Sequence, residues 1–323
     1  MQDFKSFNFT KMKTIWRYFT DFHKEVKHPP GLYISISIFI AILTAFNYLI
    51  MDIRFEKWMD RLKPDSLPYL AHFIMFSIIF YGIVFLCYRF KTIPNLFNDK
   101  AFMAKSLFML LVLTVDVCFQ YYKDITRELF EYQDRFYMYK VSSQVTSIFV
   151  MMLPILIYYL KFEKSNDNFY GLRTSVRKIG QYFPLILLMI PLIAGASFEE
   201  SFRSFYPRFS STYEFMGWSV ELRAVVFEIF YAWDFVTTEF LFRGFMVLAF
   251  TAFLGPRAIL PMVGLYVALH YGKPLGETIG SFFGGYILGV LTYQSKNIWG
   301  GIVVHMGIAL LMELAAWMQK VFN

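Results

Sequence analysis

Ionisable side chains interrupt three apolar segments near the C-terminus. Glu239 and Arg243 lie in TTEFLFRGF, His270 lies in LYVALHYG, and His305 lies in IVVHMGIA. A charged side chain at mid-bilayer costs about 2.5–3.5 kcal/mol on insertion scales, so such residues usually face a protein interior or a hydrated cavity. A carboxylate and two imidazoles can together activate water and transfer protons. We therefore expect a site for water-activating chemistry inside a membrane.

The spacing of these residues allows a plainer interpretation as well. Glu239 and Arg243 are four residues apart, so on a helix they share a face, with the acid before the base in the favourable order. This pair alone could be a buried ion pair that only fixes the position of a helix. A single histidine on an apolar helix is also more often a hydrogen-bonded residue than a catalyst. Two histidines, His270 and His305, on nearby helices shift the balance toward a site.

The composition indicates which elements must position these groups. Of 323 residues, 57% are hydrophobic and 17% are charged, whereas about a quarter of the residues in soluble domains are charged. A helix needs about 20 mostly apolar residues to cross a bilayer, so we expect an all-α, polytopic transmembrane bundle of eight to ten spans. The formal charge of +7 favours contact with anionic lipid over binding of nucleic acid. Cys87 and Cys118 lie inside candidate spans, so we expect no disulfide framework.

The apolar stretches divide the chain into three parts. Residues 1–30 form a basic, aromatic segment in the membrane interface or the cytoplasm, residues 31–200 hold the N-terminal spans, and residues 215–323 form the core that would carry the chemistry. Lysine and arginine are more frequent in the N-terminal segment and the even-numbered connectors, which favours a cytoplasmic N-terminus. The predicted helices are 31–51, 67–90, 101–122, 141–160, 182–198, 219–235, 236–254, 257–271, 278–294 and 298–319.

Three short motifs in the C-terminal part resemble those of a known family. Residues 238–244 read TEFLFRG, Tyr266 precedes His270 by four positions, and His305 precedes Ala309 by four. The CPBP intramembrane proteases, which include the type II CAAX prenyl endopeptidases and bacterial bacteriocin-processing and immunity proteins, have the motifs EExxxR, FxxxH and HxxxN or HxxxD. The glycine-rich stretch 283–289 and the turn 295–299 also look like parts of this family. The resemblance covers about residues 215–318.

The resemblance implies an activity and a set of site residues. It implies an intramembrane endopeptidase in which Glu239 activates water, His270 and His305 assist, and Arg243 orients the carboxylate. The substrate would be a membrane-associated peptide or protein, and we expect the chain in a bacterial cytoplasmic membrane. A divalent metal such as zinc is an open possibility, with Glu239, His270 and His305 as its ligands. The chain has no HExxH and no cysteine–histidine cluster that would independently require zinc.

The chain departs from the family pattern at two positions. Thr238 occupies the position of the first glutamate of the pair, and Ala309 occupies that of the asparagine or aspartate. Glu239 itself, Asp234, Glu313 and, less favourably placed, Glu277 are carboxylates that could compensate. Asp234 could instead anchor a helix at the interface, and Glu313 could pair with a basic residue elsewhere. A catalytically inactive membrane protein that binds a partner, as an immunity protein does, and a transporter are therefore the alternative functions.

Overall fold

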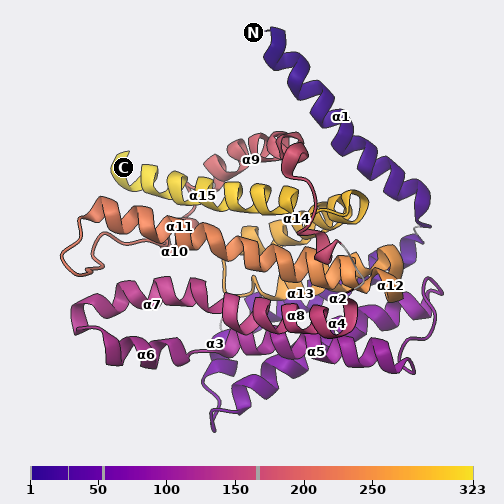
Figure 1. Ribbon diagram of the computed structural model, residues 1–323, viewed down its shortest axis with the longest axis horizontal. Coiled ribbons are helices and arrows are strands. Elements are labelled where there is room, and N and C mark those ends of the chain that lie inside the picture. Colours follow the sequence, from indigo (N-terminus) through magenta and orange to yellow (C-terminus); the bar gives the residue numbers. More distant parts are fainter. Residues whose placement is uncertain (1, 28, 53–54, 165–167, 323) are drawn as a thin grey trace.

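The computed structural model describes residues 2–27, 29–52, 55–164 and 168–322, and within these ranges every regular element is a helix. The expected all-α bundle is confirmed. Its long helices run roughly along one axis, and α1 projects from the body of the molecule (Figure 1). The elements are α1 (Gln2–Glu25), α2 (Pro30–Ala45), η1 (Phe46–Ile50), α3 (Phe55–Asp60), α4 (Leu67–Arg89), α5 (Lys100–Cys118), α6 (Tyr121–Leu129), α7 (Tyr132–Ser147), η2 (Ile148–Met152), α8 (Leu153–Tyr158), η3 (Tyr159–Glu163), η4 (Phe169–Gly171), η5 (Val176–Tyr182), α9 (Phe183–Ala196), α10 (Glu200–Phe205), α11 (Val220–Glu239), η6 (Phe240–Val247), η7 (Leu248–Phe250), α12 (Thr251–Leu254), η8 (Gly255–Ala258), α13 (Ile259–Ala268), α14 (Leu275–Ser295) and α15 (Trp299–Phe322).

Among the described residues, seven helical stretches are long and apolar enough to cross a membrane, and the protein is an integral membrane protein. They are Pro30–Ile50, Leu67–Arg89, Lys100–Leu129, Tyr132–Glu163, Ile179–Ala196, Val220–Ala268 and Trp299–Phe322. The stretch Val220–Ala268 has 49 residues and contains three of the helices expected from the sequence. The expectation of eight to ten spans exceeds these seven stretches because it divided this stretch into three helices and also counted α14 as a span.

The helix break expected between residues 235 and 236 is absent. α11 continues directly into η6, a π-helix, so Glu239 and Arg243 lie where the α-helical turn widens. The sequence from Phe235 to Phe250 has no proline, and its only glycine is Gly244, so no residue type there strongly favours ending the helix. π-Helical turns are rare and are frequent at functional sites.

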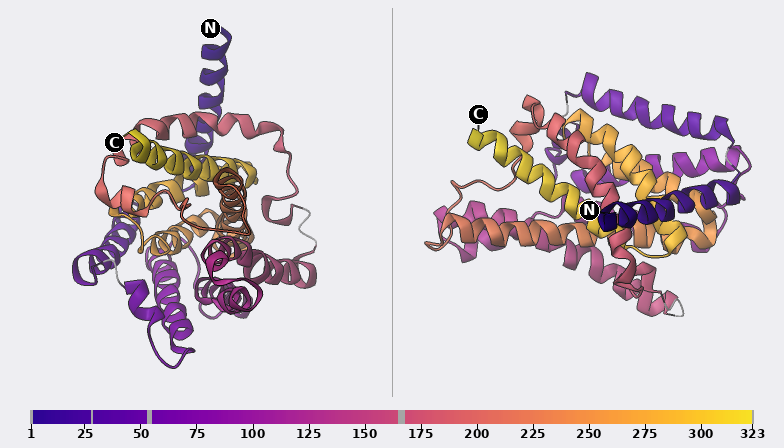
Figure 2. Two further views of the ribbon diagram at one scale, coloured as in Figure 1. Left: turned by 90° about the vertical axis from the view of Figure 1, so that its left-hand side faces the viewer. Right: turned by 90° about the horizontal axis from the view of Figure 1, so that it is seen from above.

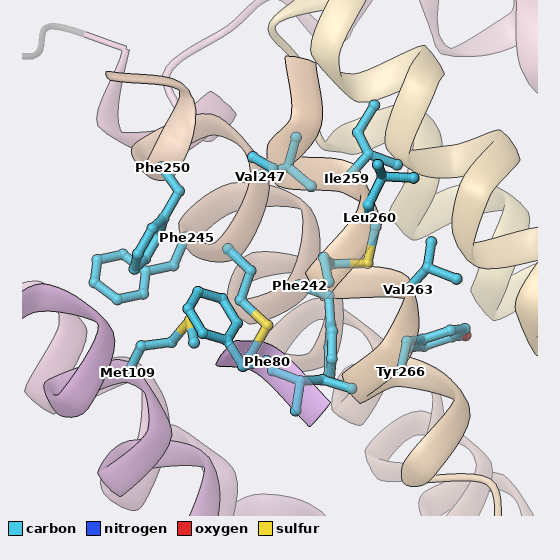
Figure 3. Close-up of a cluster of buried hydrophobic side chains, with 14 of the residues drawn as sticks. Phe80, Met109, Phe242, Phe245, Val247, Phe250, Ile259, Leu260, Val263 and Tyr266 are labelled. Carbon is cyan, nitrogen blue, oxygen red and sulfur yellow. The ribbon is translucent and has the colours of Figure 1, made fainter. Parts of the chain in front are cut away.

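η6 and α13 form the centre of the bundle, and all of their residues are buried. Figure 3 shows side chains of η6 and α13, among them Phe242, Phe245 and Val263, gathered with Phe80 of α4 and Met109 of α5. Outer helices instead expose large apolar side chains, as expected for surfaces that face lipid. The polar residues of the central helices are therefore shielded from lipid by neighbouring helices.

Close helix contacts fix the positions of α13 and α14. Gly264 of α13 lies against Ile79 and Ile83 of α4, and Gly289 of α14 lies against Ile259 of α13. Small residues allow such close approach in membrane bundles. α11 packs against both α7 and α15, which flank it on different sides (Figures 1 and 2). This packing brings the end of α11 next to the first half of α15.

Candidate active site

Glu239, the last residue of α11, pairs with two groups through one carboxylate oxygen. Its Oε1 lies 2.8 Å from Nη1 of Arg243 and 2.9 Å from Nδ1 of His305. Both Glu239 and Arg243 are completely buried. The Arg243 contact is an ion pair without hydrogen-bond alignment, and the guanidinium lies 4.3 Å from the centre of the Tyr266 ring. A cation over an aromatic face is stabilised by the ring quadrupole, so Tyr266 helps to hold the arginine.

His305 of α15 connects the carboxylate to a phenol. A carboxylate paired with an arginine only accepts hydrogen bonds, so Nδ1–H of His305 donates to Glu239. In the neutral imidazole Nε2 is then an acceptor, and the hydroxyl of Tyr266, at 3.1 Å, donates to it. The His305 side chain is 15% exposed and rests against the ring of Phe235, with centroids 4.5 Å apart. Tyr266, His305, Glu239 and Arg243 thus form one continuous polar chain.

His270 joins this group through Tyr266 and not through Glu239. It lies in the turn after α13, and its Nδ1–H donates to the backbone carbonyl of Tyr266 at 2.8 Å. The two rings are adjacent, with centroids 4.7 Å apart. Burial and then the nearby Lys273 lower the pKa of His270 well below its usual value, so the ring is neutral at pH 7. With its proton on Nδ1, the ring has only an acceptor at Nε2.

Residues of the N-terminal half hold the turn that carries His270. Nδ2 of Asn47 donates to the carbonyl of Tyr271 at 2.8 Å, and the hydroxyl of Tyr48 lies 2.5 Å from the carbonyl of Lys273. The Tyr48 hydroxyl also lies 2.7 Å from the hydroxyl of Thr278, which donates to the carbonyl of His270 at 2.6 Å. Sequence reasoning missed both Asn47 and Tyr48. The signal was the polar pair in FNYLI, at the end of an otherwise apolar span.

Besides Glu239 itself, Glu277 is the one carboxylate proposed to compensate for Thr238 that borders the group. Its Oε1 lies 4.0 Å from Nε2 of His270 and 2.5 Å from Nζ of Lys273. Its Oε2 accepts a hydrogen bond from the hydroxyl of Tyr206 at 2.9 Å. Glu277 is therefore already engaged by a lysine and a tyrosine.

Asp234 and Glu313 have other partners. Asp234 lies 3.5 Å from the hydroxyl of Ser147 on α7. Both oxygens of Glu313 accept the backbone N–H of Arg208, at 2.9 and 2.7 Å, which fixes the connector after α10. Thr238 is partly exposed and Ala309 is buried. The structure thus brings together Glu239, Arg243, His270 and His305, but not Asp234 or Glu313.

Gly301 allows Glu239 to approach α15, and sequence reasoning missed it as well. A Cβ atom at Gly301 would collide with Oε2 of Glu239. This oxygen is buried and has no hydrogen-bond partner among the described residues. The signal in the sequence was the glycine pair in WGGIVVH, because paired glycines at the start of a span indicate close packing.

The geometry does not fit a metal held by Glu239, His270 and His305 together. The Nε2 atoms of the two rings face different partners: that of His305 lies 3.1 Å from the hydroxyl of Tyr266, and that of His270 lies 4.0 Å from Oε1 of Glu277. No group of three or more histidine, cysteine, aspartate or glutamate side chains in the described ranges is arranged to hold a metal ion.

Comparison with known proteins agrees with the position of this group in the chain. Residues 219–311 match the model of a family described as type II CAAX prenyl endopeptidase Rce1-like. The matched segment starts at the N-cap of α11 and contains Glu239, Arg243, His270 and His305. Searches of curated proteins and of solved structures gave no significant match. The family match confirms, for residues 219–311, the resemblance to the CPBP intramembrane proteases.

Proposed function

We propose that this protein is an intramembrane endopeptidase of the CAAX-protease type that cleaves a membrane-associated peptide or protein. The observation that carries the proposal is the hydrogen bond from Nδ1 of His305 to the buried carboxylate of Glu239. A carboxylate that holds an imidazole in one tautomer leaves the other ring nitrogen as a base, as in hydrolytic triads. The match to a peptidase family over the same residues supports this interpretation.

The contacts favour His305 over Glu239 as the group that takes the proton from water. Oε1 of Glu239 is occupied by Arg243 and His305, and Oε2 lies against Gly301. Nε2 of His305 belongs to the more accessible side chain, and its present partner is a hydroxyl. In this proposal Glu239 orients His305 and stabilises the imidazolium, and Arg243 holds the carboxylate in place through their ion pair. The competing mechanism is the one that the family resemblance implies, in which Glu239 itself takes the proton from water.

The reaction would proceed in two steps. A water molecule gives one proton to Nε2 of His305 while its oxygen forms a bond to the peptide carbonyl carbon, whose oxygen becomes an oxyanion. Tyr266, released from Nε2, would donate its hydroxyl hydrogen bond to that oxyanion. The carbon–nitrogen bond then breaks, and the proton on Nε2 passes to the leaving amine. His270 offers Nε2 as an acceptor for an N–H of the bound peptide.

The alternative is a membrane protein that binds a partner without cleaving it. It is favoured by the complete burial of Glu239 and by Thr238 and Ala309 at two family motif positions. In this alternative, the Glu239–Arg243 pair would serve only to fix α11 in the bundle.

The two functions can be separated with the full chain in lipid nanodiscs. The probes are fluorogenic peptides with a cysteine near the C-terminus, one set farnesylated and one set unmodified. We expect cleavage by the native chain and a loss of at least about 100-fold in Glu239→Gln and His305→Ala. Glu163→Gln is the matched control, because Glu163 also pairs with a buried cation, Lys105, outside the site.

The outcome for a binding protein is different. It would show no cleavage by the native chain, and activity would appear only when Thr238→Glu and Ala309→Asn are combined. Cleavage that persists in His305→Ala would also contradict the proposed mechanism.

A further inference from the structure

A cleft of about 840 Å³ opens at one end of the bundle, away from the candidate active site. Three connectors line it: residues 25–27 and Pro29 between α1 and α2, residues 90–94 between α4 and α5, and residues 253–257 around η8. Its volume lies within the range of about 300–1,000 Å³ typical of ligand sites. The family match does not account for it, because two of its three walls lie outside residues 219–311.

The cleft is lined by three cationic side chains, Lys27, Lys91 and Arg257. Arg257 is buried, and it donates to the hydroxyl of Tyr33 at 3.1 Å and to the carbonyl of Lys27. Arg257 thereby joins the η8 wall of the cleft to the segment between α1 and α2, and it places a positive charge in that wall. Lys27 and Lys91 are exposed, and neither forms an ion pair with another described residue. Two lysine side chains at the rim are thus available to a ligand.

Among the described residues that line the cleft, Glu25 is the one carboxylate, and it forms no ion pair with these lysines. Oε1 of Glu25 accepts from the hydroxyl of Tyr293 at 2.8 Å, and Oε2 accepts from Nε2 of Gln294 at 3.1 Å. Glu25 is therefore engaged by α14. The net charge that faces the cleft is positive, which selects an anionic ligand.

Most of the other lining residues are apolar, which favours a lipid over a small anion as the ligand. Phe90, Ile93, Phe253 and Leu254 contribute side chains to the walls. The cleft lies at the ends of α2 and α4, two of the membrane-spanning helices, so these walls lie near the boundary between lipid and water. The neighbouring segments also carry Lys24, Arg89 and Lys100. Basic pockets between the cytoplasmic ends of membrane helices suit the head groups of anionic lipids.

We propose that this cleft binds one anionic phospholipid, with its phosphate between Lys27 and Lys91 and the start of its acyl chains along Phe90 and Phe253. Arg257 supplies the fixed charge behind the phosphate. This site is independent of the proposed peptidase activity, because none of its lining residues contacts the Glu239 group.

The test measures binding of short-chain, soluble lipids to the full chain in neutral detergent by native mass spectrometry. The probes are dioctanoyl phosphatidylglycerol, dioctanoyl phosphatidylcholine and inorganic phosphate. We expect phosphatidylglycerol to bind best, and its affinity to fall about tenfold or more in Lys27→Ala/Lys91→Ala. The charge-matched control is Lys24→Ala/Lys100→Ala, since both lysines are exposed near this end but do not line the cleft.

A second variant tests the cavity without changing its charge. Pro94→Trp adds bulk at the rim and should also weaken binding of phosphatidylglycerol. Thermal unfolding of each variant shows whether it is folded. Equal binding of the two lipids, equal effects of the two lysine pairs, or binding of phosphate as tightly as of phosphatidylglycerol would each overturn the proposal.

Discussion

The hydroxyl of Tyr266 lies 3.1 Å from Nε2 of His305, and the carboxylate of Glu239 lies 2.9 Å from Nδ1 of the same ring. The imidazole is therefore held at both nitrogens. The same tyrosine stacks on Arg243 and adjoins His270. Tyr266 occupies the position where the family motif has phenylalanine. Tyr266→Phe therefore removes the hydroxyl and restores the residue of the family motif.

Tyr266→Phe should lower kcat for peptide cleavage by about 100-fold and leave KM nearly unchanged, because the lost hydroxyl would leave Nε2 of His305 and donate to the substrate only as the oxyanion develops. The ring that supports Arg243 is retained. The measurement is steady-state cleavage of the fluorogenic peptides in nanodiscs. Tyr293→Phe is the control, since it loses a comparable hydrogen bond, to Glu25, outside the site. An unchanged kcat in Tyr266→Phe would show that the hydroxyl plays no part in catalysis.

Gly301→Ala should destabilise the protein and impair cleavage together. The new Cβ would collide with Oε2 of Glu239, and overpacking of this kind costs about 1–3 kcal/mol. The movement of the carboxylate would also misalign His305. Gly280→Ala is the matched control, because a Cβ there meets no atom within 4 Å, and this change within α14 should stabilise the helix by up to about 1 kcal/mol. Thermal unfolding and cleavage rate check both variants, and equal behaviour would contradict the inferred close packing of Glu239 on α15.

The helical class and most helix positions followed from the sequence, because long apolar runs bounded by proline and glycine leave few alternatives in a membrane. The expected helix 67–90 corresponds to α4, and 182–198 corresponds to α9. The division at residues 235 and 236 was wrong, since the expected span length of about 20 residues was applied to a continuous helix. No local signal marked the π-helical turn at Phe240.

The candidate site could be predicted only as a set of residue types. The spacing of Glu239 and Arg243 predicted their ion pair correctly, because it depends on a single helix. The partners of His305 and Glu313 lie on a separate helix and on a connector, respectively, and neither could be read from spacing. The role of Asn47 and Tyr48 could not be predicted for the same reason, since they lie more than 200 residues from the turn that they hold.

Tyr48→Phe should loosen the turn that carries His270 without unfolding the bundle. The variant loses the hydrogen bond to the carbonyl of Lys273 and the contact with Thr278, and one such bond contributes about 1 kcal/mol. Local opening of the turn should then become about fivefold more frequent. The measurement is amide hydrogen exchange over residues 269–275.

Tyr81→Phe provides the control for this loosening, because Tyr81 bonds to Ser106 at 2.8 Å between α4 and α5, within the N-terminal half. It should leave exchange over residues 269–275 at the native rate. If Tyr48→Phe also leaves that rate unchanged, the turn is held by Asn47 and Thr278 alone. If the rate rises as expected, the core at residues 215–323 depends on the first span for the position of His270, and a fragment that lacks this span should lose the ordered turn even where its helices form.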